Sequence, residues 1–238
     1  MIKINYRLDY TGLKWDYTAP ASKLVACLQE AAILHSEKIG LTMDYFFEEK
    51  KGWVIRNWDI EFLKPVRWNE EIEIETFPAL FKGIMAHRGF VCRNKNSEVV
   101  INASSQWVYT DRVKLKPVKV TEEMSQKYGE LKPLPVETDF KIHPIDSDNL
   151  RQSTHLVTRR DTDTNRHTNN ISYLEWITDM LTDEEYNSGR ITRLKAAFKK
   201  QCVMGDKVDI SLYTKGNSYY AAICSKGDLL SEIYFERG

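Results

Sequence analysis

The chain has 238 residues, of which 42% are hydrophobic and 29% charged, and its 34 basic side chains are balanced by 34 acidic ones. This length and composition predict one large or two small globular domains, and they exclude a disordered or fibrous protein. A net charge of zero gives no overall field that would attract nucleic acid or an anionic membrane, so any electrostatic steering of a partner must be local.

The first half of the chain is predicted to be one helix followed by an antiparallel sheet. Apolar residues recur at helical spacing over residues 22–39, and Gly40 ends the pattern. In residues 71–75, glutamate alternates strictly with isoleucine, as in a sheet with one face in water. The predicted strands of this half are 53–63, 71–77, 84–94 and 98–110.

Residues 111–152 are predicted to be a linker that crosses between two halves. The segment is polar and holds four of the seven prolines of the chain. A short helix is predicted to interrupt it over residues 121–128. The expected domains are therefore 1–115 and 151–238, joined by residues 116–150.

The second half repeats the order of the first. A helix is predicted at 171–181, and strands are predicted at 191–202, 207–215, 219–226 and 229–236. An offset of 136 aligns Phe62 with Phe198, and an offset of 150 aligns Leu24 with Leu174. This self-similarity indicates an internal repeat. One long helix packed on an antiparallel sheet, formed twice, predicts an α+β fold.

A polar segment precedes the second helix. Residues 163–170, DTNRHTNN, followed by Ile171-Ser172-Tyr173, resemble the DxNxHxNNxxY segment of acyl-acyl carrier protein thioesterases of plant plastids and bacteria. Three further segments, in order along the chain, are similar to family motifs: 28–32 to L-Q-E-T-A, 103–108 to A-S-S-x-W-V, and 198–202 to Y-R-R-E-C.

This resemblance implies a tandem (double) hotdog fold, in which each half is a long helix packed on a curved antiparallel sheet. It implies that the N-terminal hotdog forms the acyl-chain tunnel and the C-terminal one is catalytic. The implied reaction is hydrolysis of fatty acyl-acyl carrier protein to free fatty acid, with acyl carrier protein as partner and a homodimer as the expected assembly. Two alternatives stay open, an acyl-CoA thioesterase of the hotdog type and a non-catalytic acyl-binding hotdog protein.

Carried over position by position, the resemblance assigns catalytic roles to five residues. Asp163, Asn165 and His167 match the family motif. Gln201 stands where the family has its catalytic glutamate, and an amide cannot act as a base. Cys202 matches the neighbouring cysteine.

The chemistry of thioester hydrolysis suits these residue types. It needs a positioned water, a group that takes its proton, and donors for the oxyanion, but no metal or organic cofactor. His167 is a natural proton acceptor near neutral pH, while Asp163 could orient it or bind the water. Asn165 offers a donor and an acceptor, and the first-turn amides after residues 168–170 would favour an oxyanion. Cys202 could instead attack the thioester directly or simply fill the core; attack by water needs fewer special features.

The remaining features predict a cytoplasmic protein without membrane insertion. The four cysteines lack CxxC spacing, which disfavours a zinc site and a disulfide framework. The N-terminal stretch MIKINYRLDY has neither the apolar core of a signal peptide nor the pattern of a transit peptide. No apolar run approaches the length of a transmembrane helix.

Overall fold

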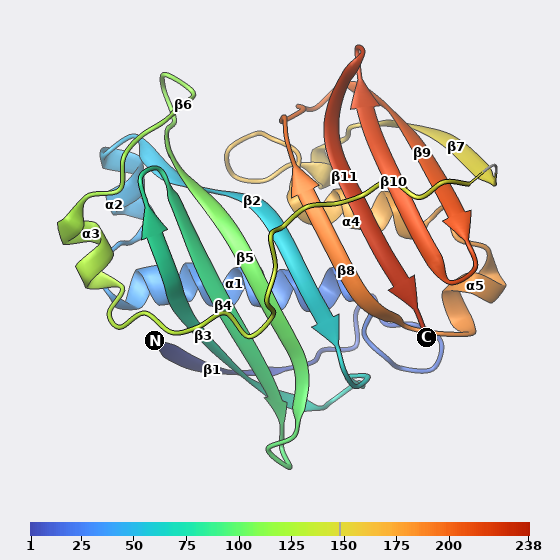
Figure 1. Cartoon of the computed structure of the whole chain (residues 1–238), viewed down its shortest axis with the longest axis horizontal. Coiled ribbons are helices and arrows are strands. Elements are labelled where there is room, and N and C mark those ends of the chain that lie inside the picture. The colour runs from blue at the N-terminus through green and yellow to red at the C-terminus, as the bar shows by residue number, and fades with distance from the viewer. Residues whose placement is uncertain (148) are drawn as a thin grey trace.

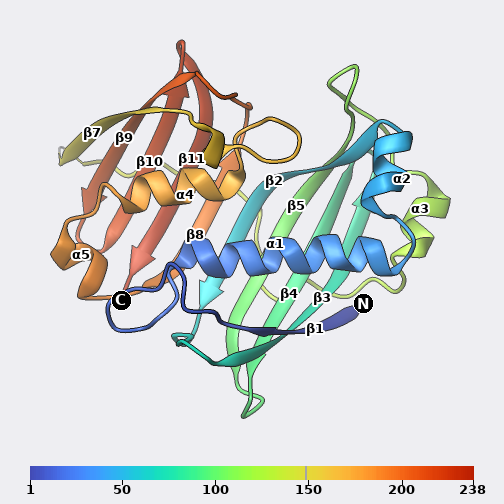
Figure 2. The same ribbon diagram turned by 180° about the vertical axis from the view of Figure 1, so that it is seen from behind.

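A computed structural model describes residues 1–147 and 149–238, and it confirms both the predicted helix-then-sheet repeat and the short helix of the linker. Helices α1 and α4 lie on one face of a continuous, curved antiparallel sheet (Figures 1 and 2). The elements of the first half are β1 (Ile2–Arg7), α1 (Ala21–Lys38), α2 (Met43–Glu48), β2 (Lys51–Phe62), β3 (Glu71–Lys82), β4 (Met85–Asn94) and β5 (Val99–Asp111). Those that follow are β6 (Lys116–Pro117), α3 (Glu122–Lys127), β7 (Leu150–Leu156), a 3-10 turn (Arg159–Asp161), α4 (Asn170–Thr178), α5 (Asp183–Asn187), β8 (Ile191–Phe198), β9 (Lys207–Lys215), β10 (Ser218–Ser225) and β11 (Asp228–Arg237).

The sheet has the strand order β1-β3-β4-β5-β2-β8-β11-β10-β9-β7, with β6 attached to β5. The sequence did not predict β1 and β7, which form the two edges. Strand β7 has an almost wholly exposed burial pattern. Without a buried face it carries no hydrophobic alternation by which a strand is recognised.

A single core runs beneath both helices. Leu24 and Leu28 on α1, Leu174 on α4, and the inward side chains of both half-sheets belong to one buried cluster. Burying this apolar stripe against the sheet is what stabilises each helix, since helices of such length are marginal by themselves. Among the described residues, no helix is both long and apolar enough to cross a membrane.

The segment between the halves crosses the opposite face of the sheet (Figure 1). The Ser104 hydroxyl donates to the carbonyl of Val136 at 2.8 Å, and the ring of Phe140 packs edge-on against His87. The segment thus covers the strands near the junction. The division into domains at residues 115 and 150 stays a prediction.

The two halves join where β2 pairs with β8, from Asn57 opposite Ala197 to Glu61 opposite Arg193. Asp59 on β2 is completely buried in this seam. Its carboxylate lies 2.6 Å from Arg193 Nη2 and 3.5 Å from Lys195 Nζ. Neither oxygen has a well-aligned hydrogen bond in the described part of the chain, so charge rather than hydrogen-bond geometry holds this carboxylate.

Replacing Arg193→Met should lower the free energy of unfolding by about 3 kcal/mol, because it removes the nearer cation from a buried carboxylate. Urea denaturation measures this change. The double variant Asp59→Asn/Arg193→Met should recover part of the loss, whereas Lys215→Met, at an exposed position of β9, should be nearly neutral. An unchanged free energy in Arg193→Met would show that the pair does not stabilise the seam.

Candidate active site

The structure brings the five predicted site residues together where a loop meets the start of α4. The backbone of residues 167–168 runs against that of residues 202–203, since His167 bridges Val203 and the Thr168 N–H donates to the Cys202 carbonyl at 2.9 Å. Segments that are more than 30 residues apart in sequence are therefore adjacent. Gln201 lies beside them with an exposed side chain.

Asp163 organises the loop rather than the imidazole ring. Its Oδ1 accepts from the backbone N–H of Asn165 at 2.7 Å and of His167 at 3.2 Å, and its own N–H donates to the His167 carbonyl at 2.8 Å. Arg166, inside this turn, has a φ of 65°, in the left-handed region that only a constrained turn holds for such a residue. The expectation that Asp163 orients the ring is not met, because its partner is the backbone of His167.

His167 is half-buried, and neither ring nitrogen has a hydrogen-bond partner among residues 1–147 and 149–238. The backbone N–H and carbonyl of His167 are both hydrogen-bonded to Asp163, but the ring makes no hydrogen bond in the described part of the chain. An imidazole in this position can accept a proton from a bound water or donate one to a leaving group.

Asn165 is exposed and contacts the first half of the chain. Its Oδ1 accepts from the Arg112 guanidinium, and its Nδ2 donates to Asp163 Oδ2 at 3.2 Å. Arg112 follows the end of β5, so the loop is tied to both halves. No pattern in the sequence predicted the contact between Arg112 and this loop.

Asn169 caps helix α4, as its residue type predicts. Its side chain accepts from the Ile171 N–H at 3.1 Å, and its carbonyl accepts from the Ser172 N–H at 3.0 Å. The cap thus satisfies two of the first-turn amides that the sequence analysis expected to be available to an oxyanion. The Asn170 N–H, in contrast, has no acceptor within the described ranges, so it is the amide that a ligand could use.

Cys202 is only 3% exposed and belongs to the core. Its Sγ lies 3.0 Å from the Thr168 hydroxyl and 3.2 Å from the Tyr173 hydroxyl. A thiol with two hydrogen-bonding neighbours and almost no exposed surface suits packing better than nucleophilic attack.

A residue that the sequence analysis left unassigned to the site, Asp161, anchors the loop. Its buried carboxylate accepts from the Thr158 N–H and hydroxyl, both at 2.6 Å, from Trp176 Nε1 at 3.0 Å, and contacts His155 Nε2 at 3.2 Å. Burial opposes ionisation, but these hydrogen bonds outweigh it and lower the pKa of Asp161 to about 2. The Thr-x-x-Asp spacing of a capping box, at 158–161, was the available signal.

Within the described residues, no group of three or more His, Cys, Asp or Glu side chains is arranged to hold a metal ion. The site therefore consists of an unengaged imidazole, a free amide at a helix start, and a loop that two carboxylates hold in shape.

Solved structures share this architecture over the whole chain. An acyl-ACP thioesterase from Bacteroides thetaiotaomicron superposes with a TM-score of 0.88 at 19% identity, covering 99% of this chain and 97% of that one. A 12:0-ACP thioesterase from Umbellularia californica gives a TM-score of 0.86 at 17% identity, covering 100% of this chain and 96% of that one. The molecule is a double-hotdog protein, as the sequence predicts.

Family models then identify the chain more closely. Residues 1–128 match the acyl-ACP thioesterase N-terminal domain, and residues 145–230 match the acyl-ACP thioesterase C-terminal domain. The chain belongs to the acyl-ACP thioesterase family.

Curated relatives agree with this membership. The chain is 26% identical over 202 residues to a chloroplastic acyl-[acyl-carrier-protein] hydrolase of Cuphea viscosissima, covering 79% of this chain and 48% of the relative. It is 25% identical over 209 residues to a chloroplastic oleoyl-acyl carrier protein thioesterase of Arabidopsis thaliana, covering 81% and 57%. The chain thus spans about half the length of the curated relatives it matches.

The substitution Asp161→Asn should lower the free energy of unfolding at pH 7 by about 2 kcal/mol, as the depressed pKa implies. The folded-state pKa lies below the unfolded value of 3.8, so this contribution is present above about pH 4 and is lost as the pH falls toward 2. Chemical denaturation of both proteins across pH 2–7 tests it. Asp179→Asn, at an exposed position just after α4, is the control. A difference between wild type and Asp161→Asn that does not shrink at acid pH would contradict the role of the ionised carboxylate.

Proposed function

We propose that this protein hydrolyses the thioester of a fatty acyl-acyl carrier protein, releasing free fatty acid and the carrier thiol. The observation that carries the proposal is the unengaged His167 ring, three residues before the free Asn170 N–H at the start of α4. A proton acceptor and an oxyanion donor on one rigid turn are what attack of water on a thioester requires. Membership of the acyl-ACP thioesterase family supports the substrate class.

In the proposed mechanism, the oxygen of a water molecule bonds to the thioester carbonyl carbon while His167 takes a proton from that water. The negative charge that develops on the carbonyl oxygen is stabilised by the Asn170 N–H and the dipole of α4, with the Asn165 amide as a second donor. When the carbon–sulfur bond breaks, the protonated His167 returns its proton to the departing thiolate. Asp163 acts indirectly, by fixing the backbone from which His167 and Asn165 project.

Acyl carrier protein is the partner we propose, and local charge supports it. Arg112 contacts Asn165, and Lys114 and Lys116 follow it on the exposed β5–β6 hairpin. Arg159 and Arg160 lie in the 3-10 turn that directly precedes the loop in the sequence. Basic side chains next to the site would steer an acidic carrier and orient its acyl arm.

We also propose that two chains pair through a sheet edge. Strand β7 is one of the two edges, and its Leu150 and Leu156 are exposed. An unpaired edge with apolar side chains is a template for a second strand. Light scattering on the purified protein measures the assembly.

A cytoplasmic location stays a prediction that rests on four unpaired cysteines.

The substitution His167→Ala should reduce kcat for a long-chain acyl-ACP by about 100-fold or more, the usual contribution of a general base, with thermal stability unchanged. Acyl-ACP and acyl-CoA substrates that carry the same acyl group should be compared in one assay. We expect a higher kcat/KM for the acyl-ACP substrate. A wild-type protein that binds acyl-ACP without turnover would instead support the non-catalytic acyl-binding alternative. That alternative is open because Gln201 replaces the glutamate of the family. Unchanged kcat in His167→Ala would rule out its catalytic role.

The substitution Cys202→Ala should leave kcat within about tenfold of wild type and cost about 1 kcal/mol of stability, through loss of the contacts to Thr168 and Tyr173. Quenched-flow mass spectrometry of the wild type should show no acyl-enzyme. An acyl group on Cys202, together with abolished turnover in the variant, would establish the covalent route instead. Cys92→Ala, another buried thiol, is the matched control.

A further inference from the structure

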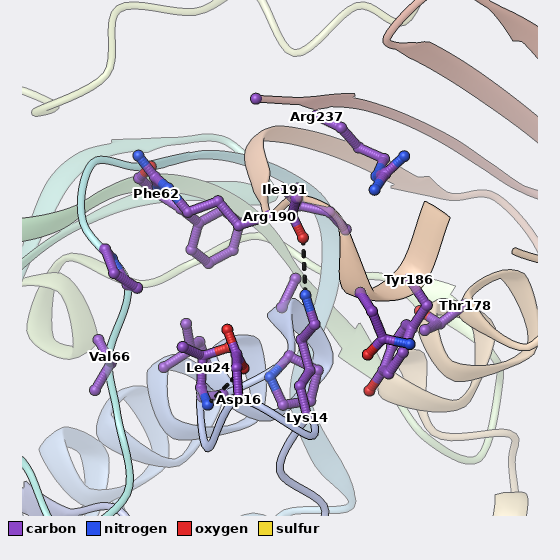
Figure 3. Close-up of a pocket in the computed structure, with 18 of the residues that line it drawn as sticks. Lys14, Asp16, Leu24, Phe62, Val66, Thr178, Tyr186, Arg190, Ile191 and Arg237 are labelled. Atoms are coloured by element: carbon purple, nitrogen blue, oxygen red, sulfur yellow. Dashed lines mark hydrogen bonds between the residues drawn. The ribbon is translucent and has the colours of Figure 1, made fainter. Parts of the chain in front are cut away.

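A pocket of about 300 Å³ lies where the two halves of the chain meet (Figure 3). Thr178, the last residue of α4, lines it, whereas His167 lies before the first residue. Since α4 has nine residues, its two ends are roughly 13 Å apart. None of the five predicted site residues lines this pocket, and its volume falls at the lower end of the range of small-molecule sites.

The floor of the pocket is apolar. Leu24 from α1, Phe62 from the end of β2 and Ile191 from the start of β8 line it (Figure 3). A crevice of about 10 Å³, which is too small for a ligand group, adjoins the pocket and shares Ala21, Thr178 and Ile191 with it. An apolar group of a ligand would therefore lie on the floor of the pocket itself.

The rim of the pocket is basic. Its charged groups are Lys14, Lys64, Arg67, Arg190 and Arg237 against Asp16, Glu185 and the terminal carboxylate of Gly238. Lys64 is paired with Glu98 and Glu185 with Arg151, so these two contribute little net charge. Within residues 1–147 and 149–238, no carboxylate lies within 4 Å of the cationic atoms of the four remaining basic side chains.

These four cations are held by neutral acceptors. Lys14 Nζ donates to the Gly189 carbonyl at 2.8 Å, and Arg190 Nη2 donates to the Leu63 carbonyl at 2.9 Å. Arg237 donates to the Tyr219 hydroxyl at 3.2 Å, and Arg67 to the backbone carbonyl of Asp16 at 3.0 Å. Carbonyls and hydroxyls fix where the cations lie, and these four positive charges face two negative ones, those of Asp16 and of the Gly238 carboxylate.

Lys14 is partly withdrawn from water. Burial lowers its pKa, Asp16 opposes this effect, and the nearby Arg237 lowers the pKa further. An anion in the pocket would favour the charged form of Lys14, and a guanidinium is suited to bind a carboxylate through two parallel hydrogen bonds.

We propose that this pocket binds a small amphiphilic carboxylate. Its head lies among Lys14, Arg190 and Arg237, and its apolar part lies on Leu24, Phe62 and Ile191. The source of the ligand rests on the proposed function, because hydrolysis of a fatty acyl thioester releases a molecule of this chemistry. The binding site itself rests only on the lining of the pocket.

Calorimetric titration of the full chain with octanoate tests the proposal, with 1-octanol as the uncharged probe. Octanoate should bind saturably, and in Lys14→Gln/Arg237→Gln its affinity should fall at least tenfold. The matched control Lys38→Gln/Arg93→Gln removes the same charges outside the pocket and should stay within twofold of wild type. Saturable binding of 1-octanol with equal affinity, or equal octanoate affinity in the pocket variant and wild type, would overturn the proposal.

A second measurement separates this site from the candidate active site and does not depend on any variant. In amide NMR spectra of the wild type, octanoate should first shift the signals of Gly189, Arg190 and Ile191. Shifts confined to residues 163–170, or no shifts at all, would overturn the proposal. Octanoate binding that persists in His167→Ala, or in a wild type without thioesterase activity, would still support this pocket, so failure of the proposed function is distinguishable.

Discussion

The pairing of β2 with β8 over five residue pairs is the constraint on which the rest of the structure depends. Because the sheet is continuous through this seam, α1 and α4 lie on the same face and contact each other (Figure 2). The same pairing brings Arg112, at the end of β5, within hydrogen-bonding reach of Asn165 in the second half. The basic pocket lies next to this seam, between the start of α1 and the start of β8. The seam holds a completely buried carboxylate, Asp59, so the junction tolerates little change.

At the candidate active site, stability and reactivity are assigned to different residues. Asp161 is buried and fully engaged, and its hydrogen bond from Trp176 ties the loop to α4. Asp163 is engaged by backbone groups of the turn. Their hydrogen bonds hold the loop from which the His167 ring projects, and that ring has no hydrogen-bond partner among the described residues. A preorganised turn of this kind needs no rearrangement when charge develops on a substrate.

The sequence predicted the helices α1, α3 and α4 and the central strands correctly because each has a periodic apolar face or clear boundary residues. It failed at the edges, β1 and β7, and at the short helices α2 and α5, since these bury few side chains and leave a weak pattern. The site followed from a motif, which identifies residue types but not their partners. Three features of the site depend on tertiary geometry, which local sequence spacing does not contain. They are the hydrogen bonds of Asp163 to backbone amides, the capping of first-turn amides by Asn169, and the contact between Arg112 and Asn165.

The exposed Gln201 makes the protonation chemistry of the site simpler. With an amide where the family has a glutamate, the carboxylates at this turn are Asp161 and Asp163, and each already accepts several hydrogen bonds. At Asp161 these hydrogen bonds stabilise the ionised form and lower the pKa to about 2, so this carboxylate is a weak base. The thiol of Cys202 is buried against two hydroxyls. In the proposed mechanism, proton transfer is therefore assigned to the imidazole of His167, whose ring nitrogens have no hydrogen-bond partner among the described residues.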